Sequence, residues 1–275
     1  TEKQKPVGPA FNADSAYLFC ASQCAFGPRT MNSEAHEQCR EWIVDKFRQY
    51  GLTVEQQHAD LMGYDGTVLH ATNIITRYQP QAERRIVIGA HWDSRPWADN
   101  DHDEGNWKKP VMAANDGASG IAVMLEVARL LSTDNQQPSP TIGIDFVCFD
   151  AEDWGTPQWS DQPDDPASWA LGAQHWSENL NPSASNTQQP SPLFGILLDM
   201  VGGEGARFYQ EAYSLHYAPS IVRKVWRAAH AVGKGSYFPR RQGGAVTDDH
   251  VPMNQVAGIP TIDIIDLQPE SVNQC

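Results

Sequence analysis

The sequence lacks the apolar segments that would tie a chain to a membrane. No run reaches the roughly 18 to 20 apolar residues that a helix needs to cross a bilayer, and Thr1–Pro6 carries no apolar signal core. Positive charge is also scarce, because 34 Asp and Glu outnumber 20 Lys and Arg and give a formal net charge of −14. Such a surface repels phosphate backbones and anionic lipid. We therefore expect no transmembrane segment and no nucleic-acid partner.

Cysteine is the next scarce residue type. The five cysteines form no C-x-x-C pair and are too few for a disulfide-built scaffold, which excludes a zinc ribbon. Cys148 lies in a run that predicts a buried strand, so it is expected to be a small core residue. Cys20 and Cys24 could pair or stay free, which leaves the redox compartment open. The other two are Cys39 and Cys275.

Helical and strand-like apolar patterns alternate along the chain. Helices are predicted at 33–50, 121–131, 174–180 and 221–229, and strands at 53–61, 73–78, 85–90, 141–150, 193–198 and 259–265. This alternation predicts an α/β fold, a three-layer α/β/α sandwich with a mixed, largely parallel central sheet. We expect a single catalytic domain over 1–275, with an N-terminal helical segment at about 10–51.

Polar residues that can bind a metal stand where the predicted strands end or just before the next element begins. They are His91, Glu152, Asp153, Asp199, Asp116, which opens a helix, and Asp248, which precedes the last strand. In open α/β sheets the ligand crevice lies at the carboxyl ends of the strands. One Asp in such a place is more often a helix cap or a turn residue. Several carboxylates on one rim repel each other, however, and a cation is the natural compensation.

Four motifs carry a specific resemblance: Ile88–Ser94, Ala114–Gly120, Phe149–Asp153 and Thr247–Pro252. They resemble the zinc aminopeptidase-like superfamily of the peptidase family M28 type. Within it the chain is similar to the glutaminyl cyclase branch of the animal type, and to its bacterial members, over about 33–266. The resemblance implies an aminopeptidase-like fold. It also implies conversion of an N-terminal glutamine of peptides or proteins to pyroglutamate, with release of ammonia.

The resemblance also implies roles for single residues. Asp116 and Asp153 match two ligands of one zinc ion per chain, and Glu152 matches the general acid/base. Asp199 and Asp248 match a catalytic pair of acidic residues that share a hydrogen bond beside the reacting centre.

Three further expectations concern residues around this centre. Trp169 matches an aromatic residue that closes over the substrate. His91 is also expected at the substrate, and it matches a histidine that binds a second metal in the peptidases but is not a ligand in the cyclases. His250 matches a supporting residue, although it could in principle replace a ligand. The family's third zinc ligand, a histidine in a Trp-His-Thr segment, is expected beyond Cys275. Without it, the 275-residue form is expected to be metal-poor and weakly active.

The chemistry of ring closure favours the cyclase over a peptidase. Cyclisation needs no activated water, because the nucleophile is the substrate's own α-amine. Glu152 can take the proton of this amine and pass it to the leaving nitrogen. Two alternatives stay open: a two-zinc aminopeptidase with a second metal on His91, Asp116 and Asp199, and a binding domain with a dead site. The presence of Glu152 argues against the latter.

The segment Asp99–Gly105 resembles a calcium loop in its alternating oxygen-bearing residues. Its glycine stands one place late for an EF-hand, and Pro110 occupies the position of the closing Glu, so a solvated acidic turn is the favoured interpretation. The resemblance to bacterial cyclases further predicts a location outside the cytoplasm, in the periplasm or secreted. We also expect a monomer.

Overall fold

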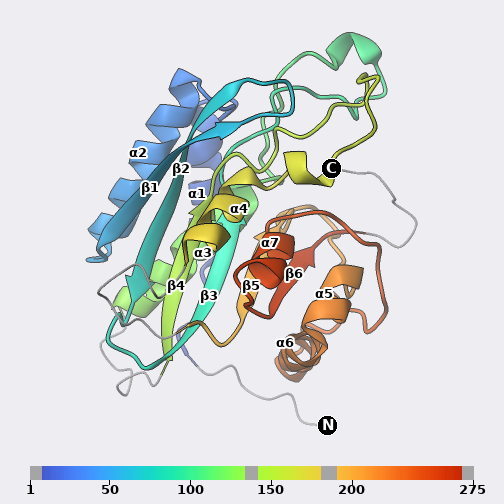
Figure 1. Cartoon of the computed structure of the whole chain (residues 1–275). Helices are drawn as coiled ribbons and strands as arrows, with labels where there is room; N and C mark the ends of the chain where they lie inside the picture. The colour runs from blue at the N-terminus through green and yellow to red at the C-terminus, as the bar shows by residue number, and fades with distance from the viewer. Residues whose placement is uncertain (1–7, 134–141, 181–190, 268–275) are drawn as a thin grey trace.

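A six-stranded mixed sheet runs through the centre of the molecule in the order β1-β2-β4-β3-β5-β6. The structure is a computed structural model that describes residues 8–133, 142–180 and 191–267 (Figure 1). β2 pairs antiparallel with both β1 and β4, whereas the β4-β3, β3-β5 and β5-β6 pairs are parallel. The strands are β1 (Val54–Met62), β2 (Val68–Tyr78), β3 (Arg84–His91), β4 (Ile142–Phe149), β5 (Gly195–Asp199) and β6 (Thr261–Ile265).

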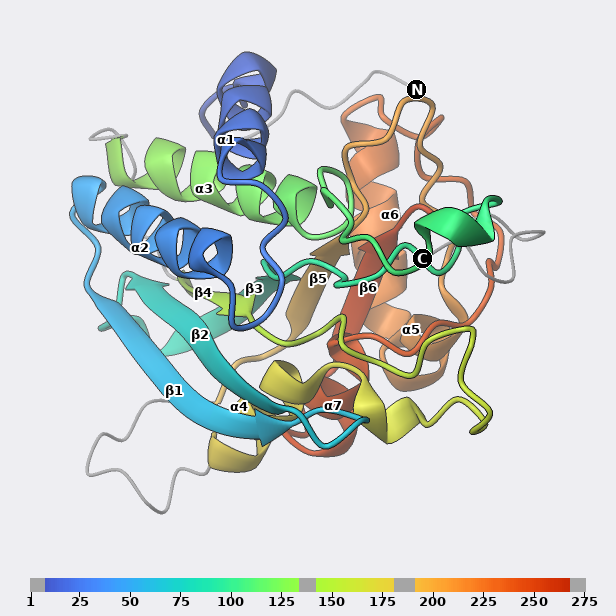
Figure 2. The same cartoon turned by 90° about the horizontal axis from the view of Figure 1, so that it is seen from above.

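Helices cover both faces of this sheet, as seen in Figure 2, and the predicted three-layer α/β/α sandwich is confirmed. The helices of the first face are α1 (Ala13–Ala25), α2 (Glu34–Gln49), α3 (Ala118–Thr133) and α6 (Pro219–Ala231). Those of the second face are α4 (Leu171–Asn179) and α7 (His250–Gln255), with α5 (Ala212–Tyr217) beside β6. None of the helices in the described ranges is both long and apolar enough to cross a membrane.

The central strand β4 shows why the sheet must be covered twice. Phe146 and Cys148 belong to the core under α2 and α3, whereas Val147 and Phe149 belong to the core under α4 and α7. A strand that is apolar on both alternations is stable only between two layers. Cys148 is fully buried, as predicted. Cys20, Cys24, Cys39 and Cys148 are free thiols, and Cys275 lies outside the described residues.

Helix α2 follows its sequence signals closely. The hydroxyl of Ser33 accepts a hydrogen bond from the backbone N–H of His36 at 3.1 Å, which caps the helix start. Gly51 follows the helix with a φ of +77°, and its N–H bonds the carbonyl of Arg48 at 2.9 Å. Between these ends the buried side chains recur every three or four residues, so this predicted helix is confirmed.

Other elements differ from the prediction for physical reasons. α1 falls within the N-terminal helical segment expected at about 10–51, but its bounds were not predicted, because Tyr17 and Leu18 are exposed and it shows no single apolar stripe. α5 and α7 were not predicted, because six residues each are too few to reveal a period. β2 begins at Val68, earlier than predicted, because its first residues pair with the end of β1 at Met62.

The start of α3 lies very close to the ends of β3 and β5. A Cβ atom at Gly120 would stand 2.4 Å from the carbonyl oxygen of Leu198 and 2.8 Å from the Cβ of Ala90. Glycine is therefore needed for this approach of helix to strands. The approach brings Asp116, just ahead of α3, next to the strand ends at His91 and Asp199.

Candidate active site

A cavity of about 530 Å³ opens where β3, β4 and β5 end. Its wall includes six of the eight residues that the sequence singled out: Asp116, Glu152, Asp153, Trp169, Asp199 and Asp248. The other two, His91 and His250, are not among the described residues that line the cavity. The long segments 92–117 and 150–170, which leave the sheet at this end, lie together at the upper right of Figure 1. The strand-end carboxylates thus converge on one cavity.

The turn that carries Glu152 and Asp153 is held by a buried carboxylate. Asp93, 1% exposed, accepts hydrogen bonds from the backbone N–H groups of Glu152 and Asp153, both at 3.1 Å. Ala151, directly before them, has a φ of +50°, an uncommon conformation for a residue with a side chain. Sequence reasoning gave Asp93 no role, although it lies only two residues past the end of β3.

Three more alanine or methionine residues near the site share this left-handed conformation. Ala113 (φ +54°) lies three residues before Asp116, whereas Ala170 (φ +54°) directly follows Trp169 and Met200 (φ +45°) directly follows Asp199. Backbone strain of this kind persists only where the surrounding structure enforces it, and it gathers at functional sites. The turns that present Asp116, Glu152, Trp169 and Asp199 are therefore all strained.

Burial and mutual repulsion shape the charge of these carboxyls. Burial raises the pKa of Glu152 well above its usual value, and the charges of Asp153 and Asp248 add to this rise, while His91 opposes it. Burial likewise raises the pKa of Asp153, against the opposing charge of Arg95. Burial raises the pKa of Asp199 to about 7, with help from Asp116 and Asp248. A bound cation would relieve this repulsion.

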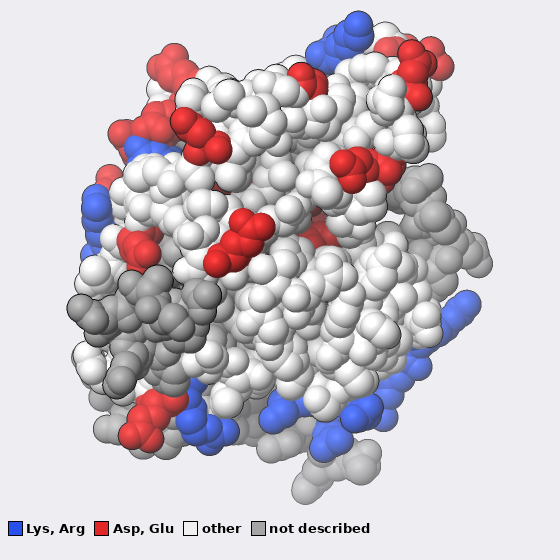
Figure 3. Space-filling model, in the orientation of Figure 1, with Lys and Arg blue, Asp and Glu red and all other residues white. Residues whose placement is uncertain are grey.

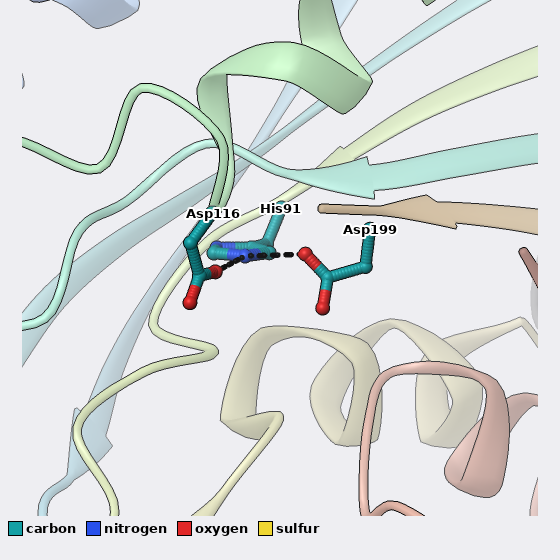
Figure 4. Close-up of side chains that lie close together, drawn as sticks. All are labelled: His91, Asp116 and Asp199. Carbon is teal, nitrogen blue, oxygen red and sulfur yellow. Dashed lines mark hydrogen bonds and ion pairs between the residues drawn. The ribbon is translucent and has the colours of Figure 1, made fainter. Parts of the chain in front are cut away.

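His91 lies behind the cavity wall and joins two of its carboxylates (Figure 4). Its Nε2 is 2.9 Å from Oδ1 of Asp116 and 3.4 Å from Oδ1 of Asp199. Burial acts to lower the pKa of His91, but hydrogen bonds to Asp116, Asp199 and Asp93 outweigh burial and hold it well above the usual value. Any influence of His91 on a substrate would pass through these carboxylates, and its predicted place at the substrate stays a prediction.

The donor atoms at this end of the sheet suit zinc. Ligand atoms of His91, Asp116 and Asp199 all lie within 4.8 Å of one another. One imidazole nitrogen with carboxylate oxygens is a donor set that zinc accepts in catalytic sites. Both predicted ligands, Asp116 and Asp153, line the cavity, and the charge of Asp116 contributes to the raised pKa of Asp153. The histidine ligand expected beyond Cys275 falls outside the described residues.

Behind Asp248 lies a second buried polar group, of which the sequence pointed to Asp248 and His250 but not to Asp263 and Glu211. Ligand-type atoms of Asp248, His250 and Asp263 lie within 4.8 Å of one another. Nε2 of His250 is 3.1 Å from Oε2 of Glu211, and the two carboxylate oxygens of Glu211 also accept the backbone N–H groups of Tyr213 and Ser214 at the start of α5. His250 therefore ties the loop of Asp248 to α5, and its supporting role stays a prediction. Asp263 interrupts the apolar run of β6, which was its only sequence signal.

Two carboxylates of the oxygen-rich segment 99–105 accept hydrogen bonds from the segment's own backbone. The carboxylate of Asp101 accepts from the backbone N–H of Asp103 at 2.8 Å, and that of Asp103 accepts from Gly105 at 2.9 Å. Asp99 is instead paired with Arg95 at 2.6 Å. These local bonds favour the acidic-turn interpretation.

Comparison with known proteins agrees with this site. Residues 73–274 match peptidase family M28. A Bacteroides thetaiotaomicron glutaminyl cyclase bound to N-acetylhistamine is 48% identical, with a TM-score of 0.90 over 96% of this chain and 88% of that one. A structure named as a leucine aminopeptidase precursor from the same species is 47% identical, with a TM-score of 0.89 over 97% of this chain and 89% of that one.

A more distant relative has a curated activity. The glutaminyl-peptide cyclotransferase of Bos taurus is 27% identical over 216 residues, which cover 70% of this chain. The match spans only 56% of that enzyme, so the chain corresponds to little more than half of the curated relative. Taken with the family match and the structural similarity, the cavity and its carboxylates show that the chain belongs to peptidase family M28 and, within it, to the glutaminyl cyclase branch.

Proposed function

We propose that this protein is a glutaminyl-peptide cyclotransferase, which converts the N-terminal glutamine of peptides or proteins to pyroglutamate and releases ammonia. The observation that carries the proposal is the position of Glu152. It is a buried carboxyl on the cavity wall, directly beside the candidate ligand Asp153 and together with Asp199 and Asp248. A general base next to a metal ligand can move a proton from the attacking to the leaving nitrogen beside a polarised carbonyl.

One zinc ion per chain is part of the proposal, with Asp116 and Asp153 as the residues that would hold it. When bound, zinc polarises the carbonyl oxygen of the substrate's γ-carboxamide. The chain contributes the orientation of the ligands: Asp93 fixes the backbone of Asp153, and His91 contacts Asp116. Such supporting contacts usually matter for metal affinity nearly as much as the ligands themselves.

The proton steps fall to the carboxyls of this chain. The α-amine of the substrate attacks its own γ-carbon, and Glu152 accepts a proton from the attacking nitrogen. Glu152 then gives that proton to the amide nitrogen, and the bond from the γ-carbon to this nitrogen breaks as ammonia leaves. Asp199 and Asp248 accept hydrogen bonds from the amine and keep it directed at the carbonyl carbon.

The charge of the molecule suits a substrate with a free amino terminus. Figure 3 shows acidic side chains around and within a hollow on one face, while many of the Lys and Arg side chains of that view lie along its lower edge. With a formal net charge of −14, the protein attracts a peptide ammonium group and concentrates it at the carboxylate-lined cavity.

An assay with a short peptide that begins with glutamine tests the reaction directly. We expect one ammonia per peptide consumed, a product of pyroglutamyl mass and no free amino acid. The same peptide with an acetylated amino terminus is the matched control and should not react, because its nitrogen cannot attack. Release of free glutamine with intact remaining peptide would reject the cyclase and identify an aminopeptidase.

Removal of the metal provides an independent prediction. Dialysis of the protein, first loaded with zinc, against a chelator is expected to lower the rate of ammonia release on the order of tenfold or more, because the carbonyl oxygen loses its polarising partner. Addition of about one equivalent of zinc per chain should restore the rate, with the zinc content measured by elemental analysis. Full activity with less than about a tenth of an equivalent of zinc per chain would contradict zinc dependence.

A two-metal aminopeptidase is the second candidate, and one observation favours it. His91, Asp116 and Asp199 place three ligand-type atoms within 4.8 Å, enough for a metal separate from the one assigned to Asp153. Such an enzyme activates water between two metals. Two zinc equivalents per chain together with release of free amino acids would establish this alternative over the cyclase.

The expected monomeric state and the extracytoplasmic location belong to the same proposal. The support for the location is the resemblance to bacterial glutaminyl cyclases, one of which overlaps with 96% of this chain. Size-exclusion chromatography with light scattering tests the first, and cell fractionation of the source organism tests the second. A dimer that persists on dilution, or activity confined to the cytoplasmic fraction, would contradict the respective expectation.

A further inference from the structure

One buried guanidinium joins the metal end of the cavity to its aromatic wall. Arg95 is 5% exposed and forms a two-pronged ion pair with Asp99, in which Nε and Nη2 each donate over 2.6 Å. Its remaining nitrogen, Nη1, donates to the carboxylate of Asp153 at 3.2 Å and to the backbone carbonyl of Asp153 at 3.3 Å. Arg95 therefore orients Asp153, the candidate zinc ligand, while Asp99 holds Arg95 from the other side.

The same guanidinium also packs on Trp169. Its central carbon lies 4.7 Å from the centre of the Trp169 ring. The ring is held from two further sides: Nε1 donates to Asp164 at 2.9 Å, and a Cβ atom at Gly155 would come within 2.0 Å of the ring. Only glycine at 155 leaves room for the ring in this position. These contacts hold the Trp169 ring in one position, with Arg95 packed directly against it.

The loop around the cavity depends on the same ion pair. Oδ2 of Asp99 accepts the backbone N–H of Gln158 at 2.9 Å as well as Nη2 of Arg95. The segment after β3 and the segment after β4 are thereby joined through Asp99. Lysine could keep the positive charge at position 95, but it has neither the fork that matches Asp99 nor the flat face that stacks on a ring.

We propose that Arg95 is a positioning residue that sets the place of the ligand Asp153 relative to the substrate-contacting wall at Trp169. The inference rests on the proposed function in one respect, since it takes Asp153 as a zinc ligand and Trp169 as a contact of the substrate. Arg95 itself also lines the cavity, but each of its three nitrogens donates to Asp99 or Asp153, so its proposed action passes through the side chains that it holds.

The test compares Arg95→Lys with Arg85→Lys. Arg85 is also fully buried and also paired with an aspartate, Asp145, but it stands at the opposite end of β3. We expect Arg95→Lys to lower kcat/KM for a glutaminyl peptide, and to weaken zinc retention against a competing chelator, each by about tenfold or more. Arg85→Lys should lower the thermal midpoint similarly while both of these quantities stay at the wild-type level.

A double-mutant cycle with Trp169→Phe separates positioning from a general loss of stability. If Arg95 acts through the ring, the fold-loss in kcat/KM of the double mutant Arg95→Lys, Trp169→Phe is smaller than the product of the two single-mutant fold-losses. Should Arg95→Lys fail to fold, Asp99→Asn loosens the same fork and is expected to show the same pattern. Wild-type zinc retention and kcat/KM in the folded variant, or losses no larger than in Arg85→Lys, would overturn the inference.

The zinc measurement also separates this inference from the proposed function. If the wild-type protein releases no ammonia, the cyclase proposal fails, but chelator competition still reports whether Arg95 orients the metal ligand. If ammonia is released and zinc retention in Arg95→Lys equals that of the wild type, the positioning role fails alone.

Discussion

The Glu152→Gln variant is expected to turn over an N-terminal glutaminyl peptide slower than the wild type by on the order of a hundredfold or more. The amide has nearly the same shape as the carboxyl but can neither accept the proton of the amine nor return it to the leaving nitrogen. The turn should be preserved, because Asp93 bonds the backbone at 152 and 153 and not the side chain. Initial rates of ammonia release measure the effect.

Glu178→Gln is the matched control for this experiment. It removes one negative charge from an exposed position on α4 and should leave turnover unchanged. Zinc content and the thermal midpoint of Glu152→Gln should both stay near those of the wild type. A Glu152→Gln enzyme with wild-type turnover would remove Glu152 from the mechanism and transfer the base role to another carboxyl of the cavity.

The Asp150→Ala variant is expected to lose about 3 to 5 kcal/mol of unfolding free energy, a large share of the stability of a typical domain. Asp150 is fully buried and accepts from Nε2 of His36 at 2.8 Å and from the backbone N–H of Thr72 at 2.7 Å. Alanine leaves both donors buried without a partner. His36, stacked on Trp92 with ring centres 4.1 Å apart, cannot turn toward water to compensate.

Asp60→Ala provides a control that differs mainly in burial. Asp60 pairs with His70 at 2.7 Å, but the two side chains are 71% and 70% exposed, so the loss should stay below about 1 kcal/mol. Urea denaturation followed by circular dichroism measures both values. Equal losses in the two variants would show that the buried pair has no special weight in the stability of the fold.

The strand-end residues were predictable because they break apolar runs. His91 closes β3 and Asp199 closes β5, and Glu152 follows β4 after a two-residue turn. A change from apolar to polar at the end of a strand is visible in the sequence itself, and parallel strands bring such ends to one edge. The resemblance then supplied the roles, which the geometry alone does not distinguish.

The supporting residues were not predictable, because their partners lie far away in the sequence. Asp93 bonds backbone groups 59 and 60 residues later, and Arg95 meets Asp153 at a separation of 58 residues. Neither residue lies at a helical or strand-like period, and Asp99 looked like part of an acidic turn. Spacing along the chain carries no information on which distant amide or carboxylate a buried charge will meet.

The four left-handed backbone positions beside the site bear on attempts to make this protein more robust. Ala113, Ala151, Ala170 and Met200 each hold a conformation that costs about 1 kcal/mol or more for a residue with a Cβ atom. Substitutions that relax these turns would raise heat tolerance at the expense of the geometry that presents the carboxylates. Directed evolution for thermal endurance should therefore accept changes on the exposed faces of α2 and α6 and discard those that straighten the loops of the cavity.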